Sequence, residues 1–164
     1  MKAKEYLQQV GKLNKIIENK TAEIEQWKMI AKSTGTFSNG ERVQSSGNPE
    51  KMADAVVNYS DIEAELLKSR QIYIMKKQEV VHTIEQLPAI EYDVLHKLYI
   101  GVVETDLEGR KFIKYLFLED VADLYSKSYS WATTVHGRAL KAVQDILDRK
   151  EKCREEMQNL WKDV

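Results

Sequence analysis

Six side chains in one predicted helix have the types and spacing needed to contact nucleic acid. They are Ser130, Trp131, Thr133, Thr134, Arg138 and Lys141. The hydroxyls can hydrogen-bond to base edges or phosphates, the two cations can meet phosphate, and the indole can pack on a thymine methyl or a protein partner. Residues 128–143 contain no acidic side chain. We therefore expect these six residues to be DNA contacts, and the alternative interpretation is a solvated helix face.

Residues able to catalyse a reaction or hold a metal are sparse. His82, His96 and His136 lie in separate predicted helices, and no HExxH or CxxC spacing is present. Cys153 lies in a charged segment with no base near it in the sequence. We expect no catalytic residue, no metal ligand and no cofactor, so the chain is predicted not to be an enzyme.

The six candidate contacts belong to a predicted helix-turn-helix. Its first helix has one apolar face, and residues 126–128 interrupt the pattern. Its second helix has apolar residues at intervals of three, four and four. The two faces consist of Leu118, Val121, Ala122 and Tyr125, and of Ala132, Val135, Ala139 and Val143. Such a pair places the second helix in the DNA major groove, while the first crosses the backbone.

Gly137 interrupts the second helix of this pair. A glycine in a helix interior costs about 1 kcal/mol relative to alanine. We expect a close approach of another helix or backbone to explain it.

Two long apolar stripes precede the helix-turn-helix. Each follows a spacing of four and three residues, from Tyr6 to Ala31 and from Ala55 to Leu87, with polar interruptions at Lys20, Ser69 and Lys76. They predict helices over 2–32 and 50–86, joined by a loop over 33–49. The prediction is an all-α chain that begins with a long antiparallel, coiled-coil-like helical hairpin over 1–87. The hairpin is a candidate surface for interaction or homo-oligomerisation, because such stripes pair equally well within and between chains.

The remaining organisation is a helix-turn-helix domain over 88–150 and a charged helical tail over 151–164. A short helix is predicted over 89–100. The segment 101–116 alternates partially and contains a turn signal, so it forms either a small β-hairpin or an irregular loop. In the first loop, a polar cluster is either a protein-binding tip or part of a flexible connection. The cluster consists of Arg42, Gln44, Ser45 and Ser46.

The bulk composition narrows the class of protein. Of 164 residues, 31% are charged, yet the net charge is −1, which disfavours strong nonspecific DNA binding. A single cysteine fits a reducing compartment. The first residues, MKAKEYLQQV, have no signal-peptide core, and no apolar stretch approaches membrane-spanning length. We expect a cytoplasmic protein without membrane contact.

The C-terminal half resembles the region of bacterial sigma factors that reads the −35 promoter element, known as region 4. The residues that carry this likeness are Leu118, Val121, Ala122, Ser128, Val135, Ala139 and Leu140. Most of the chain also resembles a family of small phage and prophage proteins allied to late-gene activators of the ArpU and RinA type. The strings that carry this second likeness are MKAKEYLQQV, ERVQSSG, KMADAV, TIEQLP, VLHKLYI and VHGRAL.

The resemblance implies a phage-type, sequence-specific transcription regulator that acts on promoter DNA, RNA polymerase or both. The alternative is a helical adaptor protein that does not bind DNA, which the near-zero net charge favours. Two features depart from the pattern: residues 101–116 look like an insertion, and the turn has Ser126 and Lys127 where glycine or asparagine and then an apolar residue are usual. A positive φ costs serine more than glycine.

Overall fold

The structure is a computed structural model, and it describes residues 1–33 and 49–160. The polar cluster of the first loop, Arg42, Gln44, Ser45 and Ser46, lies outside the described residues. Within the described ranges, none of the helices combines the length and the apolar character that crossing a membrane requires.

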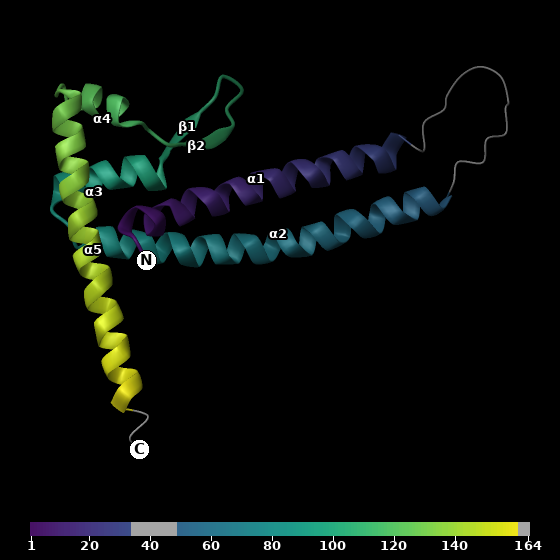
Figure 1. The fold of residues 1–164 in the computed structure, drawn as a ribbon. Coiled ribbons are helices and arrows are strands. Elements are labelled where there is room, and N and C mark those ends of the chain that lie inside the picture. Colours follow the sequence, from purple (N-terminus) through teal and green to yellow (C-terminus); the bar gives the residue numbers. More distant parts are fainter. Residues whose placement is uncertain (34–48, 161–164) are drawn as a thin grey trace. The chain divides into compact units, whose positions relative to one another are not determined.

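Two long helices, α1 (Ala3–Ser33) and α2 (Pro49–Ile84), form the predicted antiparallel pair (Figure 1). The predicted bounds, 2–32 and 50–86, are close to those observed. Helix α2 begins at Pro49, whose fixed φ suits the first turn. It ends two residues earlier than predicted, and the amide of Leu87 donates to the carbonyl of Ile84 at 3.0 Å, so the chain forms a tighter turn there before Pro88.

The chain divides into two compact units, residues 12–74 and residues 1–11 with 75–164. In the unit formed by residues 12–74, Ile24 and Leu66 are buried between the two helices. The polar interruption at Lys20 is accommodated by an ion pair of 2.6 Å with Glu65 across the helices. The hydroxyl of Ser69 donates a hydrogen bond to the backbone carbonyl of Glu65 at 2.9 Å, so Ser69 adds no unpaired donor to the stripe.

The other unit joins both ends of the chain with the end of α2. The phenol of Tyr6 lies 3.0 Å from the buried hydroxyl of Thr83, and Lys150 donates to that same hydroxyl at 3.0 Å. Its fully buried apolar residues come from α1, α2 and the following helices. They include Tyr6, Leu7, Val10, Val80, Ile84, Val94, Leu95, Val121 and Val143.

The predicted short helix over 89–100 has two parts. Helix α3 (Ala89–Leu95) continues into a π-helical segment, η1 (His96–Ile100), in which the amide of Gly101 donates to the carbonyl of His96 at 2.9 Å. Gly101 has φ +84° and ends the segment. A Cβ at this position would lie 2.5 Å from the Ile113 side chain, so only glycine fits.

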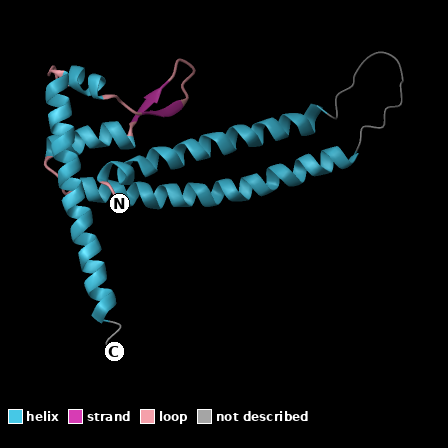
Figure 2. Cartoon of the chain, in the orientation of Figure 1, coloured by secondary structure: helices cyan, strands magenta, loops and turns pink. Residues whose placement is uncertain are grey.

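The segment 101–116 forms the β-hairpin rather than the irregular loop. Strands β1 (Val102–Thr105) and β2 (Lys111–Lys114) pair antiparallel (Figure 2). In the register of this pair, Val103 lies opposite Ile113. The turn is stabilised by Asp106, whose carboxylate accepts from the amides of Glu108 and Arg110 at 2.9 and 2.8 Å. The predicted turn signal therefore acts through an aspartate that bonds to the backbone following it.

The helix-turn-helix segment consists of α4 (Leu118–Leu124) and α5 (Tyr129–Leu160). Helix α5 is a single helix of 32 residues, so the described part of the predicted tail continues the second helix without a break. Residues 161–164 lie outside the described part of the chain.

Candidate nucleic-acid interface

The turn between α4 and α5 is a Schellman motif formed without glycine. Ser126 has φ 52°, its amide donates to the carbonyl of Asp123, and the amide of Lys127 donates to the carbonyl of Ala122, both at 2.9 Å. These two bonds satisfy carbonyls at the end of α4. The left-handed residue that the turn requires is therefore Ser126, the position where glycine or asparagine was expected.

A side chain accepts a hydrogen bond from a backbone amide at the N-terminus of each helix. The carboxylate of Asp120 accepts from the amide of Phe117 at 2.7 Å, just before α4. The hydroxyl of Ser128 accepts from the amide of Trp131 at 3.2 Å and thereby caps α5. Helix α5 begins at Tyr129, directly after the interruption that the sequence places at residues 126–128.

A small apolar core holds α4 and α5 against α3. Val94, Val121 and Val135 are buried at its centre. The predicted inward residues of α5 are likewise buried: Ala132, Val135, Ala139 and Val143. Because one face of α5 is fully used by this core, the opposite face is left for other contacts.

That opposite face carries four of the six predicted contacts. Ser130, Thr133, Thr134 and Lys141 are all exposed. Thr133 and Thr134 donate to the helix carbonyls of Tyr129 and Ser130 at 3.0 and 2.8 Å, which leaves their oxygens able to accept. Lys141 has no partner among the described residues.

Gly137 lies on the same exposed face. The prediction that another helix or backbone segment approaches it closely is wrong, as far as the described residues are concerned. A Cβ at Gly137 would have nothing within 4 Å. Its neighbours on the face, Thr134 and Lys141, are one helical turn before and after it. We call Ser130, Thr133, Thr134, Gly137 and Lys141 the outer face of α5.

Trp131 lies at the edge of the core rather than on the outer face. It is partly buried, and its ring centroid lies 5.3 Å from that of Tyr125, with the planes tilted by 50°. Protein therefore covers part of the indole, and the rest of it is exposed.

Arg138 is also beside the outer face, where it pairs with Glu91 of α3. The guanidinium side chain is 62% exposed, whereas the Glu91 side chain is only 7% exposed. Arg138 is therefore paired with an acid that comes from another helix and not from α5. Sequence reasoning missed Glu91 because it lies 47 residues away, and no pattern within α5 indicates it.

A second group of charged and polar side chains links α3 to the turn between α4 and α5. The Asp93 carboxylate accepts from Lys97 and from the phenol of Tyr125. Burial raises the pKa of Asp93, but the hydrogen bonds from Lys97 and Tyr125 outweigh burial, so the pKa is lowered overall. Burial and the bond to Asp93 raise the pKa of Tyr125 to about 12. This group holds Tyr125, and through it Trp131, in place.

The electrostatic character of the segment is divided between its two helices. Helix α4 exposes Glu119, Asp120 and Asp123, which would repel phosphate. The outer face of α5 contains no acid. Lys127 is exposed in the turn between the two helices. Cationic contact to a phosphate backbone would therefore come from the turn and α5 rather than from α4.

The histidines and the cysteine are not gathered into a site. His136 contacts Tyr99, with 2.9 Å between the imidazole Nε2 and the phenol oxygen, and burial lowers the pKa of the imidazole, with a smaller effect from Lys4. Cys153 is exposed on α5. Over residues 1–33 and 49–160, no three His, Cys, Asp or Glu side chains are grouped so that they could bind a metal ion.

Comparison of the chain with protein-family models, with curated proteins and with solved structures finds no match. The resemblance to phage regulators and to sigma region 4 therefore remains a prediction.

Proposed function

We propose that the chain is a transcription regulator of the phage type that binds double-stranded DNA through the outer face of α5. The observation that carries the proposal is an exposed face of α5 without acidic side chains, opposite the face that packs in the helix-turn-helix core. Ser130, Thr133 and Thr134 supply hydroxyls to base edges in the major groove, and Lys141 supplies a cation to phosphate. Gly137 supports the proposal, because a helix without a side chain there allows a close approach of the DNA backbone.

Promoter DNA and RNA polymerase are proposed as partners only because the chain resembles sigma region 4. The chain would bind promoter DNA as region 4 does, with α5 in the groove and α4 beside the backbone. The acids of α4 and the net charge of −1 keep nonspecific attraction weak, so affinity would depend on base contacts more than on phosphate contacts.

The alternative proposal is an adaptor that binds protein and not DNA. The pairing of Arg138 with Glu91 favours it, since it partly neutralises one of the two cations expected to meet phosphate. The exposed acids of α4 favour it as well.

Selection from a random duplex library, followed by anisotropy titration of the selected duplex, tests the two proposals. DNA binding predicts an enriched sequence and a dissociation constant below micromolar at moderate salt. Thr133→Ala and Thr134→Ala should change the base preference. Lys141→Ala should weaken binding to all sequences and reduce the slope of log K against log salt by about 0.9. Lys68→Ala, an exposed lysine of α2, is the matched control and should change neither quantity. If no sequence is enriched and no binding occurs at micromolar protein, the DNA-binding proposal is wrong and the adaptor proposal is favoured.

A further inference from the structure

The first residues of the chain lie against α5, within the unit formed by residues 1–11 and 75–164. The amide of Ala3 donates to Oε1 of Gln144 at 2.7 Å, and Nε2 of Gln144 donates to the carbonyl of Met1 at 3.3 Å. Gln144 is seven residues after Gly137, close to two full turns, so it lies on the same side of α5 as that glycine. The two bonds bracket Lys2, which is therefore held beside the outer face.

A second lysine of the same segment lies beside a flank of α5. Lys4 is near enough to His136 for its charge to lower the pKa of the imidazole, although burial has the larger effect. His136 and Arg138 are about 100° to either side of Gly137 around the helix axis. The start of α1 therefore borders one flank of the outer face, and α3 borders the opposite flank through Glu91.

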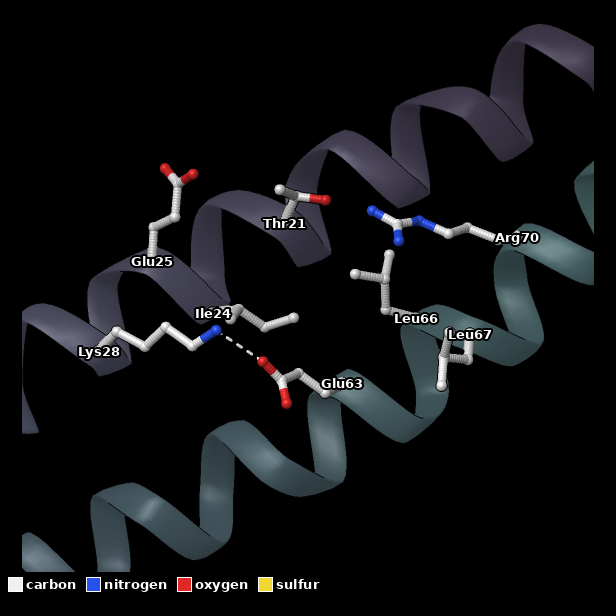
Figure 3. Close-up of a pocket in the computed structure, with 8 residues that line it drawn as sticks. All are labelled: Thr21, Ile24, Glu25, Lys28, Glu63, Leu66, Leu67 and Arg70. Carbon is white, nitrogen blue, oxygen red and sulfur yellow. Dashed lines mark hydrogen bonds and ion pairs between the residues drawn. The ribbon is translucent and has the colours of Figure 1, made fainter.

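Lys2 and Lys4 are not neutralised by ion pairs. Both are exposed, and neither has an ion-pair partner among the described residues. By contrast, Figure 3 shows Lys28 of the same helix extended toward Glu63 of α2, with 2.6 Å between the ammonium and the carboxylate. The ammonium groups of Lys2 and Lys4 are therefore available to an external anion.

A helix in the DNA major groove has a phosphate backbone along each flank. The groove is about 12 Å wide, and an α-helix with its side chains is about 10–12 Å across, so the helix nearly fills the groove. We propose that Lys2 and Lys4 contact phosphates of the strand along the His136 flank of α5, and that Gln144 positions them. This inference rests on the proposed function and adds to it a cationic contact from the opposite end of the chain.

Two acids limit this contact surface. Glu5 follows Lys4 on α1, and the carboxylate of Asp148 accepts from Nε2 of Gln144 at 2.8 Å. They keep the long-range attraction of the segment for DNA weak. Lys2 and Lys4 would therefore act through direct contact with phosphate, which a salt titration detects.

Anisotropy titrations of the selected duplex at several salt concentrations test the contact. Lys2→Ala and Lys4→Ala should each reduce the slope of log K against log salt by about 0.9, which corresponds to one phosphate contact. Lys12→Ala is the matched control, because Lys12 is also exposed, has no partner among the described residues and lies about 12 Å beyond Lys4 on the same helix. It removes the same charge and should leave the slope unchanged. Equal slopes in the three variants would overturn the proposal.

Ethylation interference locates the contact on the duplex. With the wild type, ethylated phosphates on both strands beside the groove should prevent binding. The double variant Lys2→Ala, Lys4→Ala should become insensitive to ethylation on one strand and remain sensitive on the other. A variant that changes neither strand, or both strands equally, would contradict a contact along one flank.

Gln144→Ala tests positioning separately from charge. It removes both hydrogen bonds to the first residues and keeps both lysines, so it should reduce the salt slope while far-UV circular dichroism shows unchanged helicity. An unchanged slope would exclude Gln144 as the positioning residue. If the wild type binds no duplex, the proposed function fails and this inference fails with it. If the wild type binds and the Lys2 and Lys4 variants behave as Lys12→Ala does, only this inference fails.

Discussion

Glu91 and Arg138 form an ion pair that links α3 to the edge of the outer face of α5. The acid is buried and the base is exposed, so the two partners contribute differently. Glu91 depends on Arg138 for its counter-ion, whereas water can solvate Arg138 if Glu91 is lost. A residue selected as a DNA contact therefore also has a structural role.

Arg138→Ala should lower the free energy of unfolding by roughly 1–3 kcal/mol, because it leaves the buried Glu91 carboxylate unpaired. Lys141→Ala, which breaks no contact with a described residue, should change it by less than about 0.5 kcal/mol. Urea denaturation followed by circular dichroism measures both. Equal stability of the two variants would mean that water replaces the guanidinium at no cost.

Glu91→Gln should increase DNA affinity if α5 binds DNA. The amide removes the negative charge while keeping the size of the side chain, so Arg138 becomes free to meet phosphate. The slope of log K against log salt should steepen by about 0.9, which corresponds to one added phosphate contact. Anisotropy titrations at several salt concentrations measure this slope, and Glu119→Gln on α4 serves as the control for a general loss of negative charge.

Ser126→Gly should stabilise the chain by about 0.5–1 kcal/mol, because serine bears a steric cost at positive φ that glycine does not. Both Schellman hydrogen bonds come from the backbone and survive the substitution. Thermal denaturation measures the gain. Ser128→Gly removes a capping hydroxyl and should give a small loss instead.

Replacing Gly101 and Gly137 by alanine should change the stability of the chain in opposite directions. Gly101→Ala should destabilise strongly, since φ is +84° and the new Cβ would meet Ile113 at 2.5 Å and the Lys114 carbonyl oxygen at 2.9 Å. Gly137→Ala should stabilise by about 1 kcal/mol, since its surroundings are open and alanine favours helix. If DNA approaches the outer face closely, Gly137→Ala should also weaken binding, which would separate stability from affinity in one variant.

His136 should make stability fall in mild acid. Its pKa in the folded chain is lowered by burial and by Lys4, so the unfolded chain binds the proton first, below about pH 6.5. The free energy of unfolding should therefore decrease as pH falls from that value through the lower folded pKa. Denaturation at several pH values measures the change. His136→Gln should remove part of it, and an unchanged pH dependence would exclude His136 as its source.

The sequence by itself determined the elements. Helical periodicity repeats within a few residues, so the stripes on α1, α2 and α5 and the bounds of these helices could be read locally. The turn residues around Asp106 indicated a hairpin but left an irregular loop open, because a two-stranded pair depends on what surrounds it.

Only the tertiary structure decided how these elements meet. It grouped residues 1–11 with residues 75–164, paired Arg138 with Glu91 and placed Gly137 in open space. It also turned Trp131 toward the core while leaving Thr133 and Thr134 exposed. Each of these facts depends on residues distant in the chain. Local periodicity places a residue on a face of its helix, and the packing of distant segments determines what that face meets.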